Sequence, residues 1–268
     1  MRFETLERVL KVSEEVKVAP TRVYGVAIAW IAIYGALIGV TSLVPLFPYV
    51  GGGGYLPLAV AFSAMAPLIM GPAGVLAAFV GGLIGMFVSP AAYPLGLLDV
   101  ILTATLPAVF VTLTVNNDKY WFITIPVFIA MGLWLLVFPY YWPGEAAGFS
   151  APPQPYFTAI AAWYWIPWLI IMGSPFGIKL LPKWSRETGK KQYIGVFLTL
   201  LSSMMVWAIP WFLPYWYLFS YPGTLAAAVL TAYSWWFPAL SVIITIITIP
   251  IIEGLKRSGL PRIPLAIW

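Results

Sequence analysis

Asp99 is the ionisable residue of this sequence that is best placed to do chemistry. It stands in the stretch PLGLLDVILT as the only carboxylate well inside a segment that is otherwise apolar enough to cross a membrane. A charge there is costly and often marks a pathway or a binding site. Two interpretations stay open: Asp99 meets solvent and a ligand from roughly 8 Å below the outer membrane surface, or Thr hydroxyls or a helix N-terminus satisfy it internally.

Aromatic side chains supply the second half of a candidate site. Trp and Tyr favour the headgroup level, so most of them are expected in an interfacial belt. A few lie deeper, beside Pro167 and Pro238, which break helical hydrogen bonding inside apolar segments. A carboxylate that faces such rings suits a small cationic or flat aromatic ligand. The predicted substrate-binding residues are Asp99, Tyr93, Trp163, Trp165, Trp235 and Trp236.

Several kinds of chemistry are excluded by residue types that the sequence lacks. It has no Cys and no His, which removes disulfides, thiolate and imidazole metal sites, and His-based acid–base catalysis. It also has no Walker-type phosphate loop. Glu145 and Glu253 belong to opposite sides of the predicted membrane, so they cannot act as a carboxylate pair. We therefore expect no enzyme activity, no metal and no cofactor.

The elements that position these residues are predicted to be membrane helices. Hydrophobic residues make up 62% of the chain, charged residues 9%, and the mean hydropathy is +0.92, which lies far outside the soluble range. At about 20 residues per span, the sequence predicts an all-α bundle over residues 21–252 with about eight transmembrane helices. The predicted spans are 23–46, 55–70, 72–89, 94–115, 121–142, 156–178, 193–217 and 223–252.

Two charged segments flank the predicted bundle. Residues 1–20 show an amphipathic helical pattern that suits the membrane surface, and residues 253–268 form a basic tail. When the spans are threaded from a cytoplasmic N-terminus, all 14 Lys and Arg residues fall on the cytoplasmic side. The sequence thus predicts a multi-pass protein of the plasma membrane with both ends in the cytoplasm. Its basic charge indicates topology, not nucleic-acid binding.

Small residues recur at helical spacing along two of the predicted spans. Such residues let helix backbones approach closely in lipid. We therefore expect each stripe to pack against a partner helix, either of the same chain or of a separate subunit. The first stripe consists of Gly25, Ala29, Ala32, Ala36 and Gly39, and the second of Gly74, Ala78, Gly81 and Gly85.

The second half of the sequence suggests a duplication. The stretch PYFTAIAAWYWIPWLIIMG (155–173) resembles VLTAYSWWFPALSVII (229–244) in its order of Thr-Ala, an aromatic cluster, Pro and aliphatic residues. Residues 121–178 and 193–252 are therefore a possible pair of repeated helical hairpins. The alternative is that Trp, Tyr and Pro gather at the same membrane surface without any duplication.

The segment VPLFPYVGGGGYLPLAVAFSAMAPLIMGPAGVLAAFVGGLIG (44–85) carries a family resemblance. Its outer turn, aliphatic span, Gly-Pro-x-x-Gly turn and Gly/Ala-rich span resemble the substrate-capture (S) components of energy-coupling-factor (ECF) vitamin transporters, and the likeness covers residues 44–115. The resemblance implies a membrane protein that binds a vitamin-like small molecule and depends on a coupling subunit and ATPases. It also implies that Ala32 and Ala36 pack against the coupling subunit.

Two functions follow from these observations. One is the substrate-binding subunit of a small-molecule uptake transporter, which needs other subunits because the chain lacks a phosphate loop and has almost no charge within its spans. The alternative is a non-catalytic structural or anchoring subunit of a larger complex. An outward pocket containing Asp99 would favour the first function, and a filled bundle in which Asp99 bonds internally would favour the second.

Overall fold

The computed structural model describes residues 21–48, 54–141, 161–218 and 226–268 and is mostly helical. The predicted amphipathic helix over residues 1–20 and the carboxylate Glu145 lie outside the described residues. Helix is present within each of the eight apolar segments of the sequence. The helices are α2 (Ile28–Thr41), α3 (Ala59–Met70), α4 (Ala73–Val88), α5 (Leu97–Asp99), α6 (Leu106–Val115), α7 (Asn117–Tyr141), α9 (Ile166–Gly173), α10 (Leu181–Arg186), α11 (Lys190–Leu218) and α12 (Ala226–Arg257).

Irregular and π-helical segments interrupt this regular pattern. A short 3-10 turn, η1 (Pro90–Ala92), precedes α5. Among the described residues, three π-helical segments adjoin α-helices: η2 (Val100–Thr105), η3 (Ala161–Trp165) and η4 (Phe176–Leu180). Single-turn π segments inside α-helices are rare in proteins as a whole. Where they do occur, they are often found at functional sites.

The number of long helices corrects the prediction of eight spans. Within the described residues, three helices are long and apolar enough to cross a membrane: Leu97–Val115, Lys190–Tyr215 and Ala232–Arg257. A fourth results if the bent pair Ala162–Gly173 and Phe176–Arg186 counts as one span. Hydropathy overestimated the helices in the first half because it counts apolar residues of turns and strands as helix. There α2, α3 and α4 have only 14, 12 and 16 residues.

Two small antiparallel hairpins were not predicted by the sequence analysis. β1 (Arg22–Val23) pairs with β2 (Val26–Ala27), and β3 (Pro45–Pro48) pairs with β4 (Tyr55–Pro57). In the first hairpin the two turn residues, Tyr24 and Gly25, have φ values of 51° and 81°, as a two-residue turn requires. Gly25 therefore serves this turn and is not part of a helical stripe.

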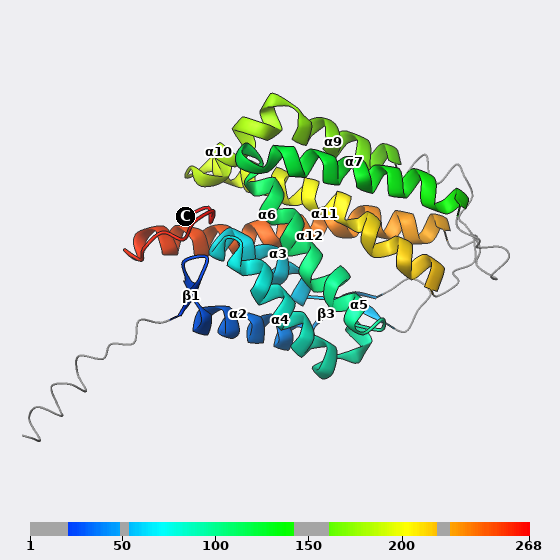
Figure 1. Cartoon of the computed structure of the whole chain (residues 1–268), viewed down its shortest axis with the longest axis horizontal. Coiled ribbons are helices and arrows are strands. Elements are labelled where there is room, and N and C mark those ends of the chain that lie inside the picture. Colours follow the sequence, from blue (N-terminus) through cyan, green and yellow to red (C-terminus); the bar gives the residue numbers. More distant parts are fainter. Residues whose placement is uncertain (1–20, 49–53, 142–160, 219–225) are drawn as a thin grey trace, which may run out of the picture.

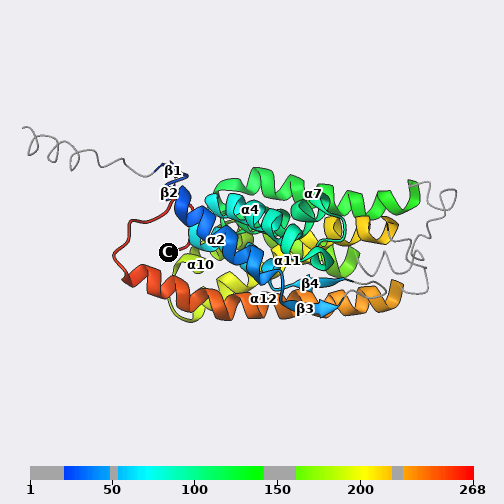
Figure 2. The ribbon, with the colours of Figure 1, turned by 90° about the horizontal axis from the view of Figure 1, so that it is seen from below.

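Many of the helices run along the long axis of the molecule, with α2 at one edge and α7 and α9 together near the opposite edge (Figure 1). Figure 2 shows α7 and α12 on opposite sides and the β3–β4 hairpin beside α12. The long helix α11 contacts α6, α7, α9, α10 and α12, so it forms the centre of the core. Its Trp207 and Trp211 are among the largest fully buried side chains.

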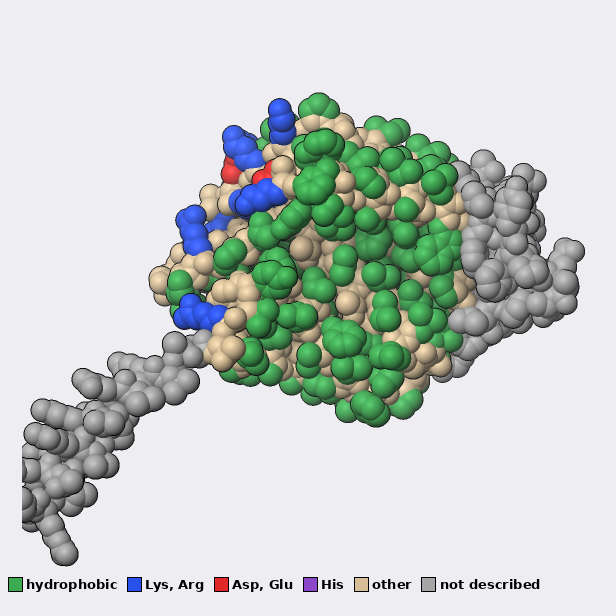
Figure 3. All heavy atoms as spheres, in the orientation of Figure 1, with side chains coloured by type: hydrophobic (Ala, Val, Ile, Leu, Met, Phe, Trp, Pro, Cys, Tyr) green, Lys and Arg blue, Asp and Glu red, His purple; other side chains and the backbone are tan. Residues whose placement is uncertain are grey.

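The surface has the character expected of a protein that sits in lipid. Exposed large apolar side chains occur on helices all around the bundle, among them Trp30, Phe87, Phe122, Ile170 and Ile246. The Lys and Arg side chains gather at one end (Figure 3), which we call the basic end. A continuous apolar surface of this kind is unusual for a soluble monomer, and it is consistent with a membrane protein.

The second stripe of small residues lies where helices approach closely. Gly74, Ala78, Gly81 and Gly85 are all buried. A Cβ atom on Gly74 would lie 2.4 Å from the backbone carbon of Ala66 in α3, and one on Gly81 would lie 2.5 Å from Cβ of Ile38 in α2. The absence of side chains on α4 thus sets its distance to both neighbours.

The alanines of the first stripe do not face another helix in the part of the chain that the structure describes. Ala29, Ala32 and Ala36 are exposed, and only Gly39 is buried with α4. The residues of α2 that are buried are Ile31, Gly35, Ile38 and Gly39. The helix therefore packs on α4 through a neighbouring face. The interpretation that the alanines of the stripe pack within this chain was wrong.

The predicted hairpin duplication stays a prediction. The helices α7, α11 and α12 have 25, 29 and 32 residues, but α9, which corresponds to α12 in the predicted repeat, has only 8. Helix α9 ends at Gly173, whereas α12 continues through Pro250 to Arg257. The segments 155–173 and 229–244, which resemble each other in sequence, thus belong to helices of different length.

The predicted tail over residues 253–268 begins as the end of α12, and the residues after Arg257 fold back onto the bundle. Residues 266–268 are buried, with the backbone N–H of Ile267 donating to the carbonyl of Leu68 (3.1 Å) and Trp268 Nε1 to that of Ile69 (2.6 Å). These α3 carbonyls need outside donors because Pro72 has no N–H and the helix ends at Met70.

The Gly71-Pro72 turn is shaped for this contact. Gly71 has a φ of 56°, and a Cβ atom there would lie 2.2 Å from the carbonyl oxygen of Pro264. A glycine is needed both for the backbone conformation and for the close approach of the tail. The turn thus ends α3, starts α4 and receives the tail.

Replacing Trp268 by phenylalanine tests the tail contact. The variant keeps a buried ring but leaves the Ile69 carbonyl without its donor, which is expected to cost about 1 kcal/mol. Thermal unfolding in detergent should show a lower midpoint. The same change at Trp235, which is 74% exposed, is expected to have no effect; equal shifts in the two variants would contradict the tail's contribution.

Candidate functional site

Asp99 lies at a break in the helix that carries it. The short helix α5 starts after Gly96, whose φ is 59°, and ends at Asp99 itself, where the π-helix η2 begins. The break frees backbone groups and turns the carboxylate towards α11. This end of the molecule lies away from the basic end (Figure 1).

The carboxylate of Asp99 is fully buried and its hydrogen bonds are internal. Oδ2 accepts from the backbone N–H of Leu95 at 2.6 Å. Oδ1 accepts from the hydroxyls of Thr103, at 3.4 Å, and of Tyr215. With an exposed fraction of 0%, the side chain does not meet solvent as its predicted depth suggested.

A row of aromatic residues on α11 supports this arrangement. Trp207, Trp211 and Tyr215 follow one another at intervals of four and therefore share one helix face. Trp211 Nε1 donates to Oγ1 of Thr103 at 3.1 Å, and Trp207 Nε1 donates to the carbonyl of Leu102 at 2.7 Å. The indole rings of Trp207 and Trp211 thus pack in the core, while their N–H groups donate hydrogen bonds to acceptors in η2.

Within the described residues, no basic side chain forms an ion pair with Asp99. The sequence has no Lys or Arg at positions 23–118 or 192–255, and the hydrogen-bond donors to the carboxylate are neutral. A buried carboxylate without a counter-charge is costly unless hydrogen bonds compensate for it. Chemically, the arrangement can bind a cation or fix α5, η2 and α11 together.

A buried aromatic cluster continues from this row into α12 and η3. The ring of Trp211 lies 5.1 Å from that of Tyr233 and 6.0 Å from that of Phe237, with edge-on geometry. Tyr164 of η3 contacts Phe237 edge-on in the same way, at 6.4 Å. Such pairs add to the stability of the core beyond their buried area.

The β3–β4 hairpin covers the same end. Phe47 stacks on Trp236 of α12 with ring centroids 5.0 Å apart and an interplanar angle of 10°. The Tyr55 hydroxyl donates to the carbonyl of Ser42 at 3.0 Å and bonds the Ser89 hydroxyl at 2.6 Å. The hairpin is therefore attached to both halves of the bundle.

The tryptophans predicted for the site are dispersed. Trp165 packs on Gly132 and donates to the carbonyl of Phe128 at 2.8 Å. Trp163 contacts Trp168 and is 43% exposed, and Trp235 is mostly exposed. Trp236 lies under the β3–β4 hairpin. None of these hydrogen bonds and ring contacts involves Asp99.

Tyr93 was predicted as a site residue, whereas two aromatic residues close to Asp99 were not. Tyr93 is buried and its hydroxyl bonds that of Ser42 at 3.1 Å. Tyr215, which bonds Asp99, and Trp211, which bonds its partner Thr103, were not among the predicted site residues. Their spacing of four along an apolar span is a visible signal, but it does not reveal which helix they face.

Comparisons with known proteins give no relative: no family model, no curated protein and no solved structure matches this chain. The site must therefore be interpreted from its own geometry.

Proposed function

We propose that the chain is a membrane-embedded substrate-binding subunit of a small-molecule uptake transporter, similar to ECF S components, that is energised by separate coupling and ATPase subunits. The observation that carries this proposal is the exposure of Ala29, Ala32 and Ala36 on α2. The family resemblance assigns Ala32 and Ala36 to the contact with a coupling subunit, and in this fold they are free to make one.

The exposed stripe suits a helix of another subunit. Alanines one turn apart let two backbones approach closely, which is how helices associate in lipid. The helix of this chain that would otherwise occupy the position, α4, packs on the neighbouring face of α2 instead. Lipid is the alternative occupant, and an experiment must separate the two.

The charge distribution supports a multi-pass orientation in the plasma membrane with the basic end in the cytoplasm. The described Lys and Arg residues belong to elements that start or finish at that end, while Asp99 and the β3–β4 hairpin lie at the other (Figures 1 and 3). Positive charge favours the cytoplasmic side. In this orientation the ligand, a small cationic or aromatic molecule, enters from outside, and the ATPases act from inside.

A second function is favoured by the geometry of Asp99. A carboxylate with neutral donors on both oxygens, in a packed interior, is what a structural or anchoring subunit would contain. In that case the aromatic core holds the bundle together and the chain organises a larger complex without binding a ligand.

Leucine at both Ala32 and Ala36 tests the proposal. The larger side chains are expected to prevent close approach of a partner helix, so co-purifying subunits should be lost from protein extracted mildly from its own membrane. Native mass spectrometry records both the subunits and any bound small molecule. Ala130→Leu is the matched control, because Ala130 is an exposed alanine on α7 at the opposite edge of the bundle.

The same spectra separate the two functions. ATPase-containing complexes with a bound cationic or aromatic metabolite support the transport function. A ligand-free chain attached to unrelated membrane proteins supports the structural function. Retention of every partner by the Ala32→Leu, Ala36→Leu variant contradicts the assignment of the stripe to a subunit contact.

A further inference from the structure

A bent helix crosses the basic end of the molecule. Residues Phe176–Arg186, comprising η4 and α10 and called the elbow helix here, are turned by 73° from Ala162–Gly173. The bend falls at Ser174 and Pro175, where Pro175 cannot continue the hydrogen bonding of α9. The elbow helix therefore leaves the direction of the bundle at the end where basic residues gather (Figure 1).

The bend is fixed by the buried side chain of Asn117. Its Nδ2 donates to the carbonyls of Met172 and Gly177 at 2.8 and 3.1 Å, one on each side of the break. Gly177 packs so closely on α9 that a Cβ atom would lie 2.1 Å from the carbonyl oxygen of Ile171. The angle is thus built into the fold.

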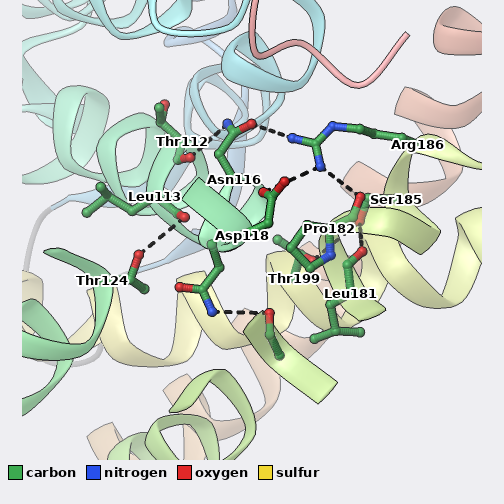
Figure 4. Close-up of polar contacts among 12 residues, drawn as sticks. Thr112, Leu113, Asn116, Asp118, Thr124, Leu181, Pro182, Ser185, Arg186 and Thr199 are labelled. Atoms are coloured by element: carbon green, nitrogen blue, oxygen red, sulfur yellow. Dashed lines mark hydrogen bonds and ion pairs between the residues drawn. The ribbon is translucent and has the colours of Figure 1, made fainter. Parts of the chain in front are cut away.

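Three further contacts fix the far end of the elbow helix. Arg186 donates to Oδ1 of Asn116 and lies 3.7 Å from a carboxylate oxygen of Asp118 (Figure 4). Lys256 of α12 donates to the carbonyl of Glu187 at 2.8 Å. The elbow helix is consequently a rigid platform attached to α7 and α12.

The outer face of this platform is basic and has no acidic partner of its own. Lys179 and Lys183 are exposed and one helical turn apart, and Lys190 is exposed nearby. In the part of the chain that the structure describes, no ion pair forms at these three lysines. The nearby acids are engaged elsewhere: Asp118 pairs with Arg186, Glu187 with Lys191, and Glu253 with Lys256 and Arg257.

Exposed apolar residues neighbour these lysines in the sequence. Leu180 is 41% exposed, and Tyr193 and Ile194 at the start of α11 are exposed as well. Lysines next to exposed apolar groups are typical of helices that lie in a membrane interface, where the stems contact lipid chains and the ammonium groups reach the phosphates. A soluble acidic partner would need the charges but not the apolar neighbours.

We propose that the elbow helix binds the phosphate headgroups of anionic phospholipids through Lys179 and Lys183. The rigid bend holds the two ammonium groups in the plane of the headgroups. The proposal holds for either function of the chain, because it depends only on a membrane around the bundle.

Lipid binding to the purified full-length chain tests this proposal. Native mass spectrometry in detergent, with phosphatidylglycerol and phosphatidylcholine added in equal amounts, measures the preference for the anionic lipid. Changing both Lys179 and Lys183 to glutamine is expected to lower the apparent affinity for phosphatidylglycerol by roughly fivefold for each lysine. The Lys179→Arg, Lys183→Arg variant should retain it.

A matched pair separates a site from diffuse charge. Arg22→Gln with Arg262→Gln removes the same charge from exposed positions at the basic end but outside the elbow helix, and is expected to bind like the unaltered protein. Equal loss in both pairs, or no loss in the elbow pair, would overturn the proposal. So would loss of a co-purifying acidic protein while lipid binding is unchanged.

Discussion

Changing Gly74 to alanine is expected to prevent α3 and α4 from packing in their native arrangement. A Cβ atom at this position would lie 2.4 to 2.6 Å from backbone atoms of Ala66 and Pro67. Backbone cannot move aside as a flexible side chain can, so the two helices must separate. Overpacking commonly lowers the free energy of unfolding by about 1–3 kcal/mol. Because the atoms that the new Cβ would meet are backbone atoms, we expect a loss of about 3 kcal/mol or more. The measurement is the yield of monodisperse protein and its unfolding midpoint in detergent.

The control for this variant is Gly254→Ala in α12. No atom lies within 4 Å of the position where its Cβ would be. Alanine is the better helix former by about 1 kcal/mol, so this variant should be as stable as the unaltered protein or more stable. If Gly74→Ala behaved like Gly254→Ala, the close contact between α3 and α4 would not exist.

Changing Asp99 to leucine is expected to destabilise the protein strongly without any ligand being involved. The backbone N–H of Leu95 and the hydroxyls of Thr103 and Tyr215 would lose their acceptor in a buried site. Each unsatisfied buried donor costs about 1–3 kcal/mol, so the total should be about 3 kcal/mol or more. Thermal unfolding of the apo protein in detergent measures it.

Variants of the hydrogen-bond donors to Asp99 serve as controls for this prediction, and a stable Asp99→Leu variant would contradict it. Tyr215→Phe and Thr103→Val each remove one donor and should cost less than Asp99→Leu. If Asp99→Leu were as stable as the unaltered protein or more stable, the carboxylate would be retained at a cost in stability. That is the behaviour of a functional group, and it would return Asp99 to the ligand site of the transport proposal.

The apolar stretches and the clustering of basic residues were predictable, because both can be read directly from the order of residues. Hydropathy located a helical segment in each of the eight apolar stretches because lipid-facing and core-facing positions are both apolar, but it missed α10, which lies in the charged stretch between two predicted spans. The Lys and Arg pattern indicated a basic end. The same uniformity explains the errors. In α2, an apolar helix on all sides, spacing alone cannot tell whether Ala32 or Gly35 faces the bundle.

Features that depend on distant pairing were not predictable. Trp268 bonds a carbonyl 199 positions away, and Tyr215 bonds a carboxylate 116 positions away. The β1–β2 hairpin was missed for a different reason: Tyr24-Gly25 is a recognisable turn, but the apolar residues around it suited a helix equally well. The number of spans failed because composition does not record where a helix stops.

The unequal helix lengths have a consequence for the surrounding bilayer. At a rise of 1.5 Å per residue, α2, α3 and α4 are about 21, 18 and 24 Å long, whereas α11 and α12 reach about 43 and 48 Å. A hydrocarbon layer of about 30 Å suits neither group. In a membrane, the lipid beside the short helix α2 is expected to thin, whereas the long helices α11 and α12 fit the hydrocarbon layer by tilting. A partner subunit that covers α2 would remove that mismatch, so the thickness of the bilayer itself would favour assembly.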